Sequence, residues 1–255
     1  MASDFFNYQQ FTIRQSHAAM KVGTDSDLLG TLAAGGRTIL DIGTGTGIIS
    51  LMLAQRYPES KITAIEIDAD AVEDAQYNFS HSPWEDRISL IHISLQEYLK
   101  SNSISPNLQI NKSTNQQNNI KRYDSIVCNP PYFDRSLECP NQGRTRARHT
   151  SSLPFPTLIN GAYTLLENDG LFSVCIPPEV FDEFTHLCLM SGFSIYSTTC
   201  VKTLPSKSPK RFVLTLKKGI TECQQQSTHC LRNQDHTRSS WYKELMRDFL
   251  ICGEL

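Results

Sequence analysis

Residues 37–47 read R-T-I-L-D-I-G-T-G-T-G, a short apolar run that passes into three alternating glycines. Apolar residues at positions 48, 49 and 51–53 then follow a helical pattern. Glycine lets the backbone approach a ligand closely and adopt positive φ angles. The stretch therefore predicts a strand, a ligand-binding turn and a helix, which together make one unit of an α/β sheet.

The glycine turn lacks both common phosphate-binding signatures. A dinucleotide fingerprint would need glycine or alanine where Ile48 stands, and a P-loop would need lysine followed by serine or threonine. A ligand without phosphate is therefore expected, and Asp41 at the strand end would attract a cation. S-adenosylmethionine meets both conditions. We predict that Asp41, Gly43, Gly45 and Gly47 hold its methionine end.

Two acids close the next predicted strand, about 20 residues beyond the glycines. This spacing places a carboxylate at the edge of the neighbouring parallel strand, where it can bind both hydroxyls of a ribose. Glu66 is the preferred ribose ligand, with Ile67 beside it as a further cofactor contact. Asp68 is interpreted as the start or cap of the following helix.

A second motif, Asn129-Pro130-Pro131-Tyr132, follows an apolar run at 124–128. Each proline fixes φ and restricts the residue before it, so the segment forms a rigid corner. The corner can aim the Asn129 amide and backbone carbonyls at an exocyclic amino group, and Tyr132 can stack on the ring that carries it. Taken alone, the motif fits a strand-capping proline turn equally well.

Glycine turn, spaced acid and Asn-Pro-Pro-Tyr, in this order, resemble the class I Rossmann-like S-adenosylmethionine-dependent methyltransferases, in their amino-methylating branch. Three more motifs, A-M-K-V-G-T-D-S-D-L-L-G at 19–30, S-P-W at 82–84 and A-R-H at 147–149, are similar to those of the bacterial tRNA (adenine-N6) methyltransferases. The resemblance covers residues 5–218. That family modifies adenine 37, beside the anticodon, of a valine tRNA.

The resemblance implies roles for further residues. Lys21, Thr24 and Asp25 would cover the cofactor, Ser94 would lie near its adenine ring, and Asn129 would contact both cofactor and target amine. Asn129, Pro130, Pro131 and Tyr132 would form the reaction centre, where Phe133 also stacks on the target base.

Strands and helices alternate along the chain as a parallel sheet requires. Strands are predicted near 38–42, 62–67, 87–93, 124–128, 170–176, 193–200 and 209–217, and helices near 26–34, 46–56, 69–81, 155–167 and 178–190. The expected class is α/β: the Rossmann-like methyltransferase fold, with a seven-stranded, mostly parallel sheet, a C-terminal antiparallel hairpin and helices on both faces. The strand order is what the resemblance implies.

The chain divides into three predicted parts. Residues 1–36 form an N-terminal segment that covers the cofactor, and residues 37–219 form the methyltransferase domain. A polar, Asn- and Gln-rich stretch at 101–122 interrupts this domain as a flexible insertion. Residues 220–255 form a polar linker and a C-terminal helix that docks on the body.

Composition fits one compact enzyme, because 255 residues with 39% hydrophobic and 20% charged side chains can bury a sizeable core. The sequence shows no apolar run near the ~20 residues of a membrane span and no basic signal-peptide start. Its eight cysteines are scattered, without a C-x-x-C pair. We predict a cytoplasmic protein with no membrane contact and no metal, and nothing in the sequence requires more than a monomer.

The net charge of −2 conceals an asymmetry. Segments 139–166 and 184–221 contain no acid but several lysines and arginines, which can neutralise the phosphates of a folded RNA. The predicted RNA contacts in them are Arg144, Arg146, Arg148, His149, Lys207, Lys210 and Arg211.

The residues favour a tRNA (adenine-N6)-methyltransferase and leave alternatives open. Ribosomal RNA bases and protein glutamine side chains are also planar amine or amide acceptors, so an rRNA-base or protein-glutamine methyltransferase is possible. A non-catalytic RNA-binding assembly protein is an alternative of another class. A nicotinamide-dependent oxidoreductase is the least favoured, because Ile48 breaks the fingerprint.

Overall fold

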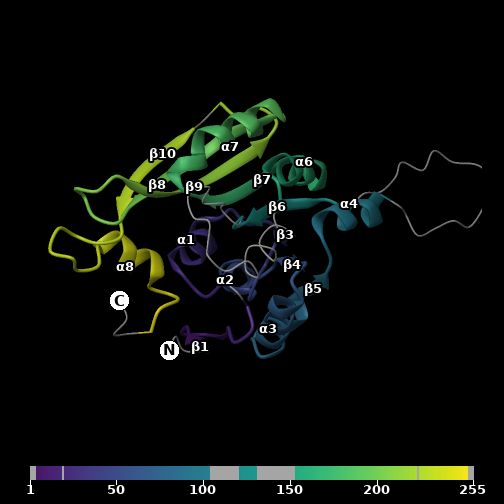
Figure 1. Ribbon diagram of the computed structural model, residues 1–255, viewed down its shortest axis with the longest axis horizontal. Helices are drawn as coiled ribbons and strands as arrows, with labels where there is room; N and C mark the ends of the chain where they lie inside the picture. The colour runs from purple at the N-terminus through teal and green to yellow at the C-terminus, as the bar shows by residue number, and fades with distance from the viewer. Residues whose placement is uncertain (1–3, 19, 104–120, 131–152, 223, 252–255) are drawn as a thin grey trace, which may run out of the picture.

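An eight-stranded sheet forms the centre of the computed structural model, which describes residues 4–18, 20–103, 121–130, 153–222 and 224–251 (Figure 1). The strand order is β10-β8-β9-β7-β6-β3-β4-β5. β9 runs antiparallel to both neighbours, and the other neighbouring pairs are parallel. The strands are β3 (Thr38–Ile42), β4 (Lys61–Glu66), β5 (Ile88–His92), β6 (Tyr123–Cys128), β7 (Leu166–Ile176), β8 (Phe193–Lys202), β9 (Pro209–Lys218) and β10 (Gln225–Cys230).

Helices cover both faces of this sheet and enclose two apolar cores. On one face, α1 (Thr24–Leu32), α2 (Ile48–Arg56) and α3 (Ala69–Ser80) contribute residues such as Leu29 and Met52 to the first core. On the other, α4 (Leu95–Ser103), α6 (Phe155–Leu165) and α7 (Pro178–Met190) contribute residues such as Leu158 and Phe184 to the second. The central strands β3, β4 and β6 are buried on both sides, which explains their continuous apolar sequences.

The predicted α/β class is confirmed, and all seven predicted strands are present. The predicted C-terminal antiparallel pair is β8 and β9, with β9 inserted between β7 and β8. The five helices predicted between residues 26 and 190 correspond to α1, α2, α3, α6 and α7.

Several elements were not predicted, β10 and α4 among them. The prediction of a polar linker over 220–238 is wrong at 225–230, because β10 forms there and pairs with β8. Its polar sequence Q-Q-S-T-H-C follows no apolar pattern, since the strand is held by backbone pairing at the sheet edge and its side chains are largely exposed. The predicted flexible insertion begins inside α4, whose last three residues are 101–103, and 104–120 lie outside the described residues.

The N-terminal and C-terminal regions pack on each other and on the first core. A hairpin of β1 (Phe5–Asn7) and β2 (Thr12–Arg14) lies beside the segment that follows α8 (Ser240–Met246). The side-chain amide of Gln9 donates to the carbonyls of Arg247 at 2.7 Å and Leu250 at 2.5 Å. α8 itself packs on the first core through Met246, so the predicted C-terminal helix lies against the body of the protein.

The buried carboxylate of Asp27, on α1, binds the N-terminal region. The hydroxyl of Tyr8 donates to Asp27 at 2.6 Å, and burial raises the pKa of Asp27 to about 6 despite this hydrogen bond.

A short 3-10 turn, Glu85–Arg87, leads into β5.

The helices that the structure describes include none that is long and apolar enough to cross a membrane. Within the same residues, no group of three or more histidine, cysteine, aspartate or glutamate side chains is placed to hold a metal ion.

Candidate active site

Three glycines with positive φ angles form the turn between β3 and α2. Gly43, Gly45 and Gly47 have φ angles of 69°, 58° and 83°, which favour glycine. Among the described residues, a β-carbon at Gly43 or Gly45 would meet no atom within 4 Å, whereas one at Gly47 would collide with the ring of Phe79. The first two glycines therefore leave room for a ligand above the turn, and the third is required by packing.

Glu66 lies at this turn, as the sequence spacing predicts. Its Oε2 accepts a hydrogen bond from the Gly45 amide at 2.9 Å, and its Oε1 accepts from the amides of Ile67 at 2.8 Å and Asp68 at 2.9 Å. An ionised carboxylate offers about four lone-pair sites, so it can accept a further hydroxyl. Ile67 beside it is 50% exposed and gives the site an apolar wall.

Asp41 is fully buried beneath the turn. Its Oδ2 accepts hydrogen bonds from the hydroxyls of Thr44 at 2.6 Å and Ser50 at 2.7 Å. Its Oδ1 has no hydrogen-bond partner among the described residues. Burial raises the pKa of Asp41 to about 6, although the two hydroxyls oppose the shift and the negative charge of Glu66 adds to it. A buried carboxylate with one oxygen unpartnered among the described residues, beneath this turn, fits a cationic ligand without phosphate, which describes S-adenosylmethionine.

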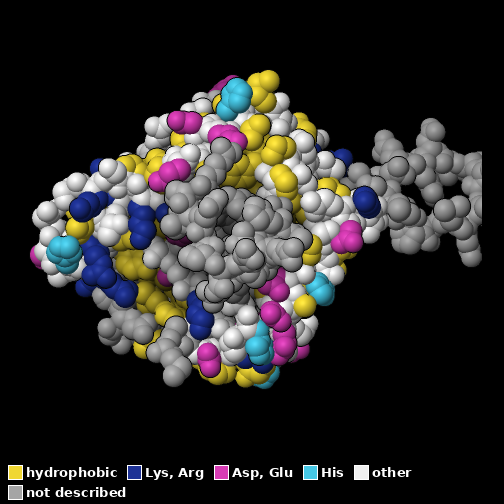
Figure 2. All heavy atoms as spheres, viewed as in Figure 1, with side chains coloured by type: hydrophobic (Ala, Val, Ile, Leu, Met, Phe, Trp, Pro, Cys, Tyr) yellow, Lys and Arg dark blue, Asp and Glu magenta, His cyan; other side chains and the backbone are white. Residues whose placement is uncertain are grey.

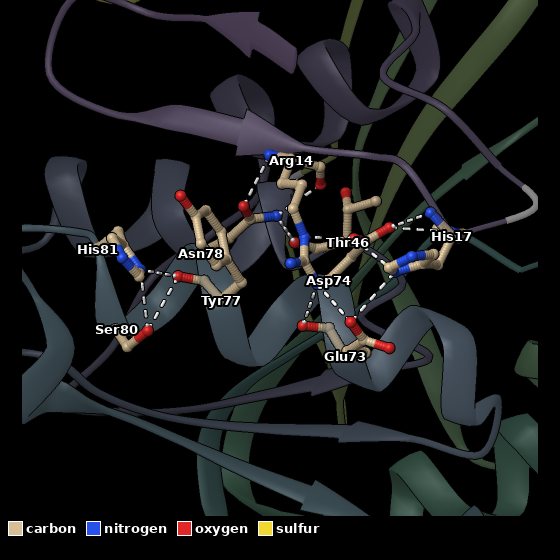
Figure 3. Close-up of polar contacts among 10 residues, drawn as sticks. Arg14, His17, Thr46, Glu73, Asp74, Tyr77, Asn78, Ser80 and His81 are labelled. Atoms are coloured by element: carbon tan, nitrogen blue, oxygen red, sulfur yellow. Dashed lines mark hydrogen bonds and ion pairs between the residues drawn. The ribbon is translucent and has the colours of Figure 1, made fainter. Parts of the chain in front are cut away.

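Two polar side chains of α3 tie the N-terminal region to the turn (Figure 3). The Asn78 amide donates to the carbonyls of Arg14 at 2.9 Å and Thr46 at 2.8 Å, and accepts from the Arg14 amide at 2.7 Å. Asp74 accepts from the Arg14 guanidinium at 2.8 Å and from the amides of His17 and Ala18, both at 2.9 Å.

The side chains of Asp74 and Asn78 are almost completely buried. Although burial opposes it, the hydrogen bonds from Ala18, His17 and Arg14 hold the pKa of Asp74 below its ordinary value. Sequence reasoning missed this pair. The available signal was two polar residues four positions apart on the helix face that carries Ala71 and Ala75.

The segment predicted to cover the cofactor leads into α1. Lys21 is exposed, Thr24 begins the helix, and Asp25 forms an ion pair with Arg211 at 2.8 Å. The structure thus brings a predicted cofactor residue into contact with a predicted RNA residue. The sequence gives no sign of this contact, which spans 186 positions.

Asn129 and Pro130 follow β6 at the edge of the sheet where the glycine turn follows β3. β3 and β6 are parallel neighbours, with Ile42 opposite Cys128, so the two segments leave the sheet side by side. Asn129 is half-buried and Pro130 is buried. Burial raises the pKa of the preceding thiol, Cys128, and the charges of Asp41 and Glu66 add to the shift.

Ser94 has a structural contact of its own. Its hydroxyl donates to Glu97 at 2.6 Å and accepts from the Glu97 amide at 3.2 Å, so it caps the start of α4. Lys207 is exposed in the turn between β8 and β9, and Lys210 is exposed at the start of β9. The remaining predicted site residues lie outside the described residues: Pro131, Tyr132, Phe133, Arg144, Arg146, Arg148 and His149.

An open, mostly parallel sheet with a glycine turn after β3 and an acid at the end of β4 defines the Rossmann-like, S-adenosylmethionine-dependent methyltransferases. A family model described as methyltransferase small domain matches residues 15–177. Among solved structures, a predicted O-methyltransferase from Agrobacterium tumefaciens superposes with a TM-score of 0.63 over 88% of this chain and 96% of its own. At 18% identity this supports the fold alone.

Two curated relatives carry the name tRNA1(Val) (adenine(37)-N6)-methyltransferase. The protein from Phocaeicola vulgatus is 41% identical over 88% of both chains. The protein from Bacteroides thetaiotaomicron is 39% identical over 98% of this chain and 99% of its own. This chain belongs to their family, within the methyltransferase small domain proteins, and it is an enzyme that uses S-adenosylmethionine.

Proposed function

We propose that this enzyme methylates the exocyclic N6 amino group of adenine 37 in a valine tRNA, in the cytoplasm. One observation carries the proposal: the Asn129-Pro130 corner and the glycine turn leave neighbouring strands β6 and β3 at the same edge of the sheet. This brings an amine-binding motif next to a turn that fits the methyl donor. The names of the curated relatives support adenine in tRNA as the acceptor.

The cofactor would lie over the glycine turn. Asp41 and the backbone of Gly43, Gly45 and Gly47 would hold its methionine end. Glu66 would accept hydrogen bonds from the ribose hydroxyls, with Ile67 against the adenine ring and Ser94 near its edge. Bound in this way, S-adenosylmethionine supplies a methyl group on a positively charged sulfur.

Within the N-terminal segment, Lys21, Thr24 and Asp25 would cover the cofactor. The hydrogen bonds of Asp74 and Asn78 to residues 14–18 support this role, because they fix the start of the segment against the glycine turn. A segment held in place before binding loses less conformational entropy when the ligand arrives.

At the reaction centre, the Asn129 amide oxygen and the Pro130 carbonyl would accept hydrogen bonds from the target amine. These bonds draw the nitrogen lone pair out of conjugation with the ring and point it at the methyl group. No strong base is needed, because the neutral nitrogen attacks and its proton leaves after transfer. Alignment supplies much of the rate.

The target base would be held by stacking on Tyr132 and Phe133, a contact worth ~1–3 kcal/mol per base. Reaching it requires the nucleotide to be extruded from its loop. The phosphates around it would contact a set of basic residues: Arg144, Arg146, Arg148, His149, Lys207, Lys210 and Arg211.

The test is transfer of radiolabelled methyl groups to the total tRNA, rRNA and protein fractions of a strain that lacks the protein, followed by mapping of the labelled nucleosides and amino acids. We expect label in N6-methyladenosine of a valine tRNA. Label in rRNA or in protein glutamine would replace the proposed acceptor with one of the alternatives. No transfer to any acceptor, with intact RNA binding, would favour an assembly protein.

The Asn129→Ala variant tests the reaction centre. Methyl transfer should fall by about tenfold or more, because one hydrogen bond of ~1.4 kcal/mol is lost in the transition state. Calorimetry should show nearly unchanged affinity for S-adenosylmethionine. Turnover equal to that of the wild type would refute the role of Asn129.

A further inference from the structure

The strands at the far end of the sheet point toward the edge that carries the proposed active site. β8 is antiparallel to β9, which is antiparallel to β7, so β8 runs in the same direction as β7 and β6. β10 is parallel to β8. The ends of β8 and β10 and the start of β9 therefore lie at the same edge as Asn129, which follows β6.

The segment after β10 lies along the turn between β8 and β9. The Leu231 amide donates to the Lys202 carbonyl at 2.9 Å, and the Arg232 amide donates to the Thr203 carbonyl at 3.0 Å. Farther along, the Gln234 side chain reaches the Ser206 hydroxyl at 3.5 Å. Two stretches of chain that are well separated in sequence thus form one continuous surface.

Residues 232–238 form an ordered loop on this surface. The Asn233 amide donates to the Thr237 carbonyl at 2.8 Å, and the His236 amide donates back to the Asn233 carbonyl at 3.0 Å. The Arg232 guanidinium donates to the His236 carbonyl at 2.8 Å. These bonds fix the loop and keep Arg232 exposed at its base.

The surface is basic. The segments that form it carry four partly or fully exposed cations, and we call this set the tail surface: Lys202, Lys207, Lys210 and Arg232. Asp235 is the acid of the loop, and the Thr237 amide and hydroxyl bind its carboxylate at 3.0 and 2.6 Å. Figure 2 shows lysine and arginine side chains gathered on its left side, where Figure 1 places the ends of β8 and β10.

We propose that the tail surface binds the sugar-phosphate backbone of the substrate RNA, and that the loop after β10 is an RNA-binding element. The inference rests on the proposed function and adds Lys202, Arg232 and the C-terminal loop to it. Strands spaced ~4.8 Å apart place β8 about 14 Å and β10 about 19 Å from β6. The tail surface therefore binds phosphates some nucleotides away from the target adenine and contributes to affinity rather than to chemistry.

The double variant Lys202→Gln with Arg232→Gln tests the proposal by binding of a valine tRNA transcript over a range of salt concentrations. Each phosphate contact contributes about 0.9 to the slope of log affinity against log salt, so the slope should fall by about 2. Affinity at physiological salt should weaken by about tenfold. The turnover number at saturating tRNA and the affinity for S-adenosylmethionine should not change, which also verifies folding.

A matched control removes the same charge from the opposite edge. Lys61 and Arg122 are exposed at the starts of β4 and β6, and the double variant Lys61→Gln with Arg122→Gln should keep the wild-type slope. The proposal would be overturned if the Lys202/Arg232 double variant kept the wild-type slope, or if both double variants lowered the slope equally. Binding is measured without turnover, so the salt slopes decide this proposal independently of methyl transfer. A wild-type protein that transfers no methyl group to tRNA would refute the proposed function instead.

Discussion

Replacing Asn78 by alanine removes three hydrogen bonds that join α3, β2 and the glycine turn. The bond to the Thr46 carbonyl is buried, and the two bonds to the Arg14 backbone are partly buried. Leaving a buried partner unsatisfied costs ~1–3 kcal/mol, and a partly buried bond contributes ~0.5–1.5 kcal/mol. We expect the free energy of unfolding to fall by about 3 kcal/mol in total.

Urea denaturation measures this loss, and Asn160→Ala is the control. Asn160 is exposed on α6, so its replacement should change stability by less than about 0.5 kcal/mol. At a temperature where both variants are folded, Asn78→Ala should also bind S-adenosylmethionine more weakly, because Thr46 in the turn loses its anchor. Stability equal to that of Asn160→Ala would refute the argument.

Three further predictions concern the cofactor turn and the RNA contacts. Burial raises the pKa of Asp41 to about 6, so the folded protein keeps a proton that the unfolded chain releases near pH 4. The contribution of this group to the free energy of unfolding therefore falls as the pH rises from 4 to 6. A bound cation favours the ionised form, so calorimetric affinity for S-adenosylmethionine should rise from pH 5 to 7. Asp41→Asn should abolish this rise and Asp27→Asn should keep it. Gly43→Ala should lower stability by ~1–2 kcal/mol and abolish cofactor binding. Gly219, also at positive φ and with no described atom within 4 Å of an added β-carbon, is the control: Gly219→Ala should lower stability in urea denaturation and leave cofactor binding unchanged. Replacing Arg144, Arg146 and Arg148 by alanine should weaken tRNA binding and flatten its salt dependence, and an unaltered slope would count against that segment.

The fold could be predicted where burial imposes a pattern. β3, β4 and β6 are buried on both faces, so their sequences are continuous apolar runs between turn signals. β10 could not be predicted in this way, because backbone pairing with β8 holds it and its side chains need not be apolar. α4 was missed because it leads directly into a polar stretch.

The candidate site could be predicted where spacing along the chain determines distance. A carboxylate at the end of the strand after a glycine turn must lie beside that turn, and Glu66 does accept from the Gly45 amide. Contacts between distant segments carry no such signal. The ion pair of Asp25 with Arg211 depends on how α1 packs against β9, which the sequence does not reveal.

β10 also affects the behaviour of the protein at high concentration. Without it, β8 would expose unpaired backbone amides and carbonyls along Ser197–Lys202, a template onto which another copy of the chain can add a strand. β10 occupies this template with a short strand of exposed glutamine, serine and threonine side chains, which offers little apolar surface for further stacking. β10 therefore lowers the tendency of β8 to pair with another copy of the chain.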